Sequence, residues 1–152
     1  MAAESDAVDE RRIADVFERA PALVDGLRRA GPHASVDDLM RTAGALVDAM
    51  STTERIALLD AHPRLGAYQA TLSAASAREQ GRPADARTLG ELAGLNDEYE
   101  RRFGFRCVVF VAGRPKDALV PVLRARLARD RATELRTGLD ELLAIARDRL
   151  RR

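Results

Sequence analysis

Only one run in this chain has the composition of a β-strand. It is the stretch from Cys107 to Val111, which reads Cys-Val-Val-Phe-Val. A lone strand has no neighbour to bond its backbone amides and carbonyls, and such groups are rarely left unpaired inside a protein. The sequence therefore argues against a sheet. It predicts an all-α fold in which the residues from Phe105 to Val111 form one buried extended segment.

Elsewhere, apolar residues recur three and four positions apart, which is typical of helices. Pro21 fits the first position of a helix, and Ser35 can accept a hydrogen bond from the first turn of another. Ser51-Thr52-Thr53-Glu54 matches a capping box. Further helices are predicted near 11–17, 72–80, 88–103 and 116–130, with a last one ending at Leu150. We expect a compact single-domain bundle of about eight helices over residues 10–152. Residues 1–9 should form a flexible tail.

Length and charge exclude several kinds of partner. The chain has 152 residues, 25 of them Lys or Arg and 24 Asp or Glu, so its net charge is only +1. No basic surplus favours nucleic acid. The single cysteine, Cys107, cannot form an internal disulfide, and no apolar run has the length of a signal peptide or membrane span. We expect a soluble cytoplasmic protein of one domain that binds neither nucleic acid nor a membrane.

His62 is the leading candidate for proton transfer. It is one of only two histidines, and an imidazole can give or take a proton near neutral pH. Pro63 disfavours helical geometry at His62, so the helix begun at Ser51 should end before it. His62 is then predicted in a turn just beyond a helix C-terminus, where the helix carbonyls favour a protonated ring. A purely structural capping role is the alternative.

Ser76, Glu79 and Gln80 lie three to four positions apart and share one side of the helix predicted over residues 72–80. A hydroxyl, a carboxylate and an amide can together hold a small polar ring by several hydrogen bonds. The alternative is a solvated helix end, which is the commoner fate of such residues.

Arg126 falls on the apolar face of its predicted helix. With Leu119 at zero on a helical wheel, Arg126 lies at about 340° and Arg124 at about 140°, outside the apolar stripe. A buried guanidinium needs an anion or several acceptors. That partner can be Glu79 or another acid, or a carboxylate or carbonyl of a substrate. Asn96 also lies on an apolar stripe, and we predict a structural role for it, bracing the extended segment or a neighbouring helix.

Metal chemistry and cysteine chemistry are not predicted. His33 and His62 have no partners at the spacing of metal ligands, and Cys107 stands outside any reactive motif.

These motifs resemble those of the OHCU decarboxylases of urate breakdown. That family converts 2-oxo-4-hydroxy-4-carboxy-5-ureidoimidazoline (OHCU) to allantoin without a cofactor. The stretch His62-Pro63-Arg64-Leu65-Gly66 fits the family's HP-x-[LI]-G motif, and Ser76 to Gln80 fits S-x-x-E-Q. Arg126 to Asp130 fits R-L-x-x-[DN], and the run from Phe103 to Val109 resembles F-G-F-x-F-V-V. The resemblance is close from Ser51 to Leu150 and weaker before that.

The resemblance implies a cofactor-free carboxy-lyase that forms (S)-allantoin and carbon dioxide. It implies that His62 and Glu79 manage the protons of the substrate hydroxyl and the enediolate carbon, and that Arg126 stabilises the anion. Substrate-binding roles are implied for six further residues: Pro63, Ser76, Gln80, Phe105, Val108 and Val109. A homodimer, and a functional association with urate oxidase and hydroxyisourate hydrolase, are also expected.

The chain departs from the family pattern at several positions. Cys107 replaces the usual aromatic residue, and Gly31-Pro32-His33 stands where many members have Arg-Pro-Phe. The loop after Gly66 is shorter than in many members. Two other functions stay open, a non-catalytic helical interaction module and a hydrolase acting on a related ureido compound.

Overall fold

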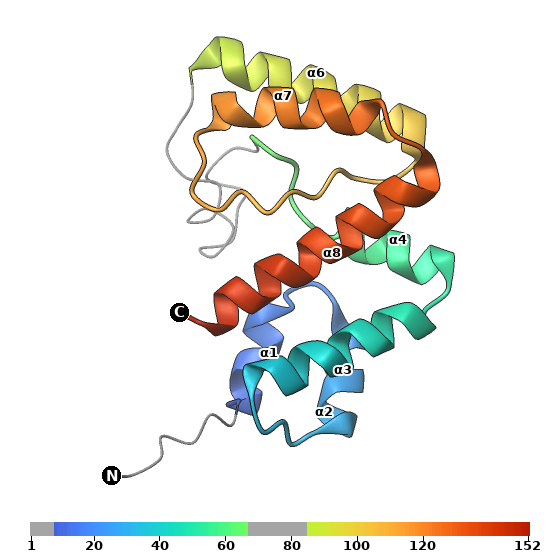
Figure 1. Cartoon of the computed structure of the whole chain (residues 1–152), viewed down its shortest axis with the longest axis vertical. Coiled ribbons are helices and arrows are strands. Elements are labelled where there is room, and N and C mark those ends of the chain that lie inside the picture. Colours follow the sequence, from blue (N-terminus) through green and yellow to red (C-terminus); the bar gives the residue numbers. More distant parts are fainter. Residues whose placement is uncertain (1–7, 67–84) are drawn as a thin grey trace. The chain divides into compact units, whose positions relative to one another are not determined.

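The computed structural model describes residues 8–66 and 85–152, and these ranges are helical with connecting turns (Figure 1). They contain seven helices: α1 (Glu10–Val16), α2 (Pro21–Ala30), α3 (Val36–Ala49), α4 (Thr52–Asp60), α6 (Ala86–Phe103), α7 (Lys116–Leu127) and α8 (Arg131–Leu150). Within the same ranges there is no strand. The all-α prediction is confirmed, although the helix number is slightly below the predicted value of about eight. The helix predicted over residues 72–80 lies outside the described residues.

The helix starts follow the capping residues that the sequence contains. Ser35 Oγ accepts from the Asp38 amide at 3.1 Å and caps α3. The capping box at α4 is reciprocal, since Ser51 Oγ accepts from the Glu54 amide at 3.1 Å and Glu54 Oε1 from the Ser51 amide at 3.4 Å. Pro21 occupies the first turn of α2. These local predictions are confirmed because each depends on residues within one turn.

The backbone contacts divide the chain into two compact units, one of Met1–Leu58 with Leu143–Arg152 and one of Leu59–Leu142. In the first unit, α2 packs against both α1 and α3. Its core includes fully buried apolar residues from all three helices: Ile13, Leu23, Leu27, Leu39, Ala43 and Val47. That residues 10–152 form a single domain stays a prediction.

The second unit holds α6 and α7, which pack side by side (Figure 1). Between them in sequence, residues 105–111 belong to no helix or strand, and Figure 1 shows this stretch running back along the length of α6. The buried residues of this stretch are Phe105, Cys107, Val108, Val109 and Val111. The predicted buried extended segment is therefore confirmed.

The helical wheel of α7 is also confirmed. Leu119, Leu123 and Arg126 are buried, whereas Arg124 is exposed. Two details elsewhere differ from the sequence pattern, which predicts Ile56 and Ala93 on the buried faces of their helices. Ile56 of α4 is only partly buried, because Leu58 joins Leu59 on the buried side, and Ala93 of α6 is exposed.

No helix in the described ranges combines the length and the apolar character that crossing a membrane requires.

Candidate active site

His62 lies in the turn that directly follows α4. The helix ends at Asp60, and the His62 amide donates to the Leu59 carbonyl at 3.1 Å to close the turn. Pro63 then prevents any further helical turn, because its ring crowds the preceding residue. His62 is partly buried, so its ring is neither sealed in the core nor fully solvated. The position predicted for His62 is confirmed.

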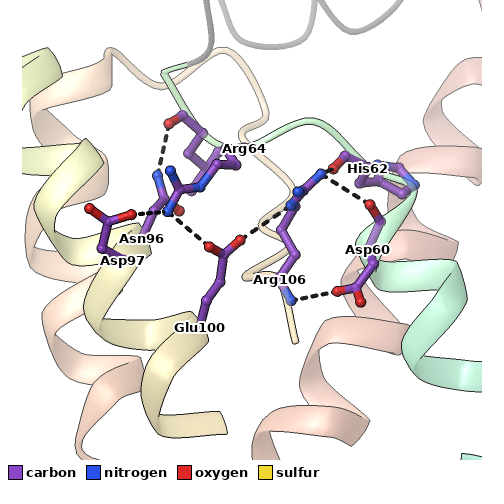
Figure 2. Close-up of polar contacts among 8 residues, drawn as sticks. Asp60, His62, Arg64, Asn96, Asp97, Glu100 and Arg106 are labelled. Carbon is purple, nitrogen blue, oxygen red and sulfur yellow. Dashed lines mark hydrogen bonds and ion pairs between the residues drawn. The ribbon is translucent and has the colours of Figure 1, made fainter. Parts of the chain in front are cut away.

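Arg106, at the start of the extended segment, holds this turn. Its Nη1 donates to the Asp60 carbonyl at 3.0 Å and to the His62 carbonyl at 2.6 Å. The backbone amide of Arg106 also donates to Asp60 Oδ1 at 2.9 Å. A helix end leaves carbonyls without intrahelical partners, and the guanidinium supplies the missing donors. Figure 2 shows the His62 carbonyl turned toward Arg106.

Glu100 of α6 links Arg106 to a second arginine in the same turn. Glu100 Oε1 accepts from Arg106 Nε at 3.3 Å, and Oε2 accepts from Arg64 Nη2 at 2.9 Å (Figure 2). Arg64 Nη2 also donates to Asp97 Oδ1 at 2.6 Å. The hydrogen bond from Arg64 lowers the pKa of Asp97 and keeps that carboxyl ionised. Arg64 and Arg106 therefore share one carboxylate, that of Glu100.

Asn96 fixes the end of the same turn. Its side chain is buried, and its Nδ2 donates to the Leu65 carbonyl at 3.0 Å. A structural role was predicted for Asn96, but its partner is the turn after His62 rather than the extended segment or a helix. Gly66, next in sequence, has a φ of 79° that favours glycine.

Arg126 lies in a buried polar cluster in the second unit. Its Nε donates to Glu134 Oε1 at 2.7 Å, its Nη1 to the Val108 carbonyl, and its Nη2 to the Tyr99 hydroxyl at 3.5 Å. Tyr99 in turn donates to Glu134 Oε1 at 2.6 Å. Arg126 is 5% exposed and Glu134 is 0% exposed. From the sequence, the possible partners of Arg126 are Glu79, another acid or a substrate group. The partner found within the described residues is another acid, Glu134.

Burial sets the protonation of the groups around Arg126. Burial is the main cause of the raised pKa of Tyr99. The Tyr99 hydroxyl therefore keeps its proton and remains a donor to Glu134. Burial likewise raises the pKa of Cys107 to about 12, which leaves a neutral thiol at physiological pH. Arg129 adds a second positive charge, with its Nη1 at 3.3 Å from Glu134 Oε2.

The extended segment connects the two sets of residues. Arg106 bonds the His62 turn, and two positions later the carbonyl of Val108 accepts from Arg126. Phe105 is buried against the aromatic rings of α6, with ring centroids 6.0 Å from Tyr99 and 6.0 Å from Phe103. The segment is thus anchored at its start and near its middle through contacts to His62 and Arg126, two residues that the sequence singles out.

Residues 3–151 match the family model of OHCU decarboxylase. The chain belongs to this family. A 2-oxo-4-hydroxy-4-carboxy-5-ureidoimidazoline decarboxylase of Haloferax volcanii is 31% identical, over 90% of this chain and 83% of its own length. One of Mus musculus is 33% identical, over 90% of this chain and 80% of its own length. A crystal structure of an OHCU decarboxylase in the presence of (S)-allantoin shares the fold, with a TM-score of 0.74 and 22% identity over 93% of this chain and 95% of that one.

The structure describes part of the site that the OHCU decarboxylase motifs predict. His62, Pro63, Phe105, Val108, Val109 and Arg126 lie in described residues of the second unit. Ser76, Glu79 and Gln80, which form the family's second motif, lie outside the described residues. The catalytic and substrate-binding roles of all nine residues stay predictions.

Sequence reasoning missed two of the residues that hold this site, Glu134 and Arg106. Glu134 had a usable signal, because it falls about 20° from the buried Ile145 on the wheel of α8. Arg106 had none, because its partners Asp60 and His62 lie on a distant turn that only the fold brings close.

Proposed function

We propose that this chain decarboxylates OHCU to (S)-allantoin and carbon dioxide without a metal or organic cofactor. The match of residues 3–151 to the OHCU decarboxylase family carries the proposal. Relatives that share about the same length bear the name of this enzyme, including the protein of Haloferax volcanii. A crystal structure of an (S)-allantoin synthase shares the fold, with a TM-score of 0.71 and 21% identity over 93% of this chain and 48% of that one.

The chemistry needs proton control and charge stabilisation. The bond between the ring carbon and the carboxylate breaks, carbon dioxide leaves, and the electron pair spreads into the ring. A proton then forms the new carbon–hydrogen bond of allantoin. We assign proton transfer to His62 and Glu79, because an imidazole and a carboxylate can each accept and return a proton near neutral pH. Ser76, Gln80 and the backbone amides at Phe105, Val108 and Val109 would hold the ring and the ureido arm, beside Pro63.

Arg126 retains capacity to bind an anionic substrate. A guanidinium has five N–H donors, and within the described residues three of them are used by Glu134, Val108 and Tyr99. Two N–H groups remain for a substrate carboxylate or the charge that develops as carbon dioxide leaves. Fixed donors in a site of low dielectric stabilise such charge well, because they need no reorganisation during the reaction.

One observation favours a second candidate, a non-catalytic helical interaction module. Arg126 is paired inside the fold with Glu134, and this is the arrangement that a purely structural arginine requires. In that case its burial would serve stability alone, and no substrate would be needed to balance its charge.

A stereochemical assay separates the two candidates. Freshly formed OHCU loses carbon dioxide spontaneously and gives racemic allantoin, because no group directs the proton to one face. Urate would be oxidised and hydrolysed to OHCU in the presence of the purified chain, with circular dichroism of allantoin recorded over time. We expect one dextrorotatory enantiomer, formed faster than in the blank and unaffected by a chelator. Racemic product at the blank rate would reject the decarboxylase and favour the module.

The wider setting is proposed on the same basis. One relative, a bifunctional uric acid degradation protein of Bacillus subtilis, is 32% identical over 91% of this chain, which spans 28% of that protein. We propose that this chain acts in urate breakdown, beside urate oxidase and hydroxyisourate hydrolase, as a cytoplasmic homodimer.

A further inference from the structure

We propose that Arg106 is a positioning residue for His62, and that Glu100 holds Arg106 in the geometry this requires. The kinetic part of this inference rests on the proposed function. The inference concerns a side chain that lies outside the nine predicted site residues and acts through the backbone of His62.

The contacts fix the His62 turn from the extended segment. One nitrogen of Arg106, Nη1, donates to both Asp60 and His62 carbonyls, at 3.0 and 2.6 Å. The amide of Arg106 donates to Asp60 Oδ1 at 2.9 Å, so the backbone and the side chain of Arg106 both bind the C-terminal end of α4. Since Pro63 also restricts the backbone of His62, these contacts fix the backbone position from which the imidazole extends.

Glu100 gives the guanidinium a single orientation. Its Oε1 accepts from Arg106 Nε at 3.3 Å while its Oε2 accepts from Arg64. The carboxylate is 31% exposed and the two arginines 30% and 32%, so the pairs are only partly screened by solvent. A planar guanidinium held at Nε presents its Nη1 in a fixed direction, whereas a lysine would place one flexible charge there.

Loss of these contacts should lower kcat more than it weakens substrate binding. Arg106 donates to protein carbonyls through Nη1, and its effect on catalysis would pass through the position of the imidazole. Misplacement of a catalytic group by about 1 Å can lower a rate by about a hundredfold. We therefore expect Arg106→Gln to lower kcat roughly tenfold to hundredfold, with a much smaller change in KM. Glu100→Gln and Arg106→Lys should show the same pattern with smaller losses.

The extended segment offers a matched control at its other end. Arg114 Nε donates to the Val111 carbonyl at 2.9 Å, and its Nη2 to the Phe110 carbonyl at 2.6 Å. Arg114→Gln therefore removes the same charge and the same type of contact without touching the His62 turn. It should lower the thermal midpoint while kcat stays within about twofold of wild type.

A mutant cycle tests whether Arg106 acts through His62. In the His62→Asn background, Arg106→Gln should cause no further loss of rate, because the imidazole it positions is already gone. An equal loss in both backgrounds would overturn the proposal.

A spectroscopic measurement tests the same idea without any turnover. The chain has only two histidines, so each contributes one Hε1 ring-proton signal to the NMR spectrum. Arg106→Gln should shift or broaden the signal of His62 and leave that of His33, whose Nε2 lies 2.8 Å from the Leu27 carbonyl oxygen, unchanged. An unchanged His62 signal in folded Arg106→Gln protein would overturn the proposal. A wild-type chain that does not decarboxylate OHCU would reject the proposed function, and the NMR result would still decide the positioning role.

Discussion

At the scale of single residues, Arg126 and Glu134 depend on each other because both charges are buried. Their side chains are 6% and 0% exposed, and 2.7 Å separates Arg126 Nε from Glu134 Oε1. Removing one partner of a buried pair leaves the other charge without compensation, which costs about 3–5 kcal/mol of stability. An exposed ion pair contributes at most about 1 kcal/mol.

We predict that Arg126→Ala and Arg124→Ala differ sharply, although both remove one guanidinium from α7. Arg126→Ala should lower the free energy of unfolding by about 3–5 kcal/mol and abolish turnover. Arg124 is 64% exposed, so its loss should cost less than about 0.5 kcal/mol and leave the rate unchanged. Urea unfolding and steady-state rates measure both effects. Equal behaviour of the two variants would contradict the arrangement of α7.

A double replacement separates the stability role of Arg126 from its proposed role in catalysis. Arg126→Met with Glu134→Leu removes both charges together, and apolar replacement of a buried pair is often close to neutral. Recovery should be partial, because Tyr99 and the Val108 carbonyl lose their partners. The refolded variant should remain inactive. Restored turnover would show that Arg126 serves the fold alone.

His62→Asn should separate chemistry from folding in the opposite way. His62 lies in a turn and is only partly buried. The free energy of unfolding of the variant should therefore lie within about 1 kcal/mol of the wild-type value. Loss of general acid–base assistance should reduce kcat by about 10²- to 10⁴-fold. A folded His62→Asn protein with near-normal kcat would contradict the catalytic role.

At the scale of elements, the passage from α6 into the extended segment depends on the backbone of Gly104. This residue ends α6 in a left-handed conformation, with φ 78°, and its amide donates to the Glu100 carbonyl at 2.9 Å. Among the described residues, a Cβ at Gly104 would meet no atom within 4 Å, so the backbone conformation is what opposes another residue type there. Glycine is favoured at such helix ends because it lacks the Cβ that penalises positive φ.

The same substitution should therefore have opposite effects at two glycines of α6. Gly104→Ala should lower the free energy of unfolding by about 1 kcal/mol, because alanine resists the left-handed conformation. Gly94 lies inside the helix, and in the part of the chain that the structure describes a Cβ there also meets nothing within 4 Å. Gly94→Ala should raise stability by up to about 1 kcal/mol through the higher helix propensity of alanine. Thermal or urea unfolding of both variants checks the signs, and a shared sign would contradict this account of Gly104.

At the scale of the whole molecule, the sequence predicted what depends on neighbouring residues. The caps at Ser35 and Ser51, the inward face of Arg126 and the lone extended segment follow from patterns within a few residues. The long-range partners of Arg106 and Arg126 could not be predicted in the same way. Arg106 and His62 are 44 positions apart, and the pairing of Arg126 with Glu134 crosses the turn between two helices. Such pairs depend on how elements fold together, which a helical wheel does not contain.

Stability at alkaline pH is also a property of the whole chain, because it compares the protons bound by the folded and unfolded states. Burial raises the pKa of Cys107 from 9.0 to about 12. Between these values the unfolded thiol loses its proton while the folded thiol keeps it, so the unfolded state binds fewer protons. Stability must then fall as pH rises. The contribution is fully present below about pH 9 and is lost on the way to about pH 12.

We predict that this loss can be assigned to Cys107 by comparing slopes. One proton corresponds to about 1.4 kcal/mol per pH unit, so the wild type should lose stability more steeply than Cys107→Ala between about pH 9 and pH 11. Cys107→Ala also removes a buried sulfur and will unfold more easily at neutral pH, but that loss is the same at every pH. The other titrating groups are common to both proteins, so the difference in slope reports the thiol together with its coupling to Tyr99, whose pKa Cys107 also raises. Urea unfolding at a series of pH values gives both slopes, and parallel curves would mean that the Cys107 thiol ionises as readily in the folded chain as in the unfolded one.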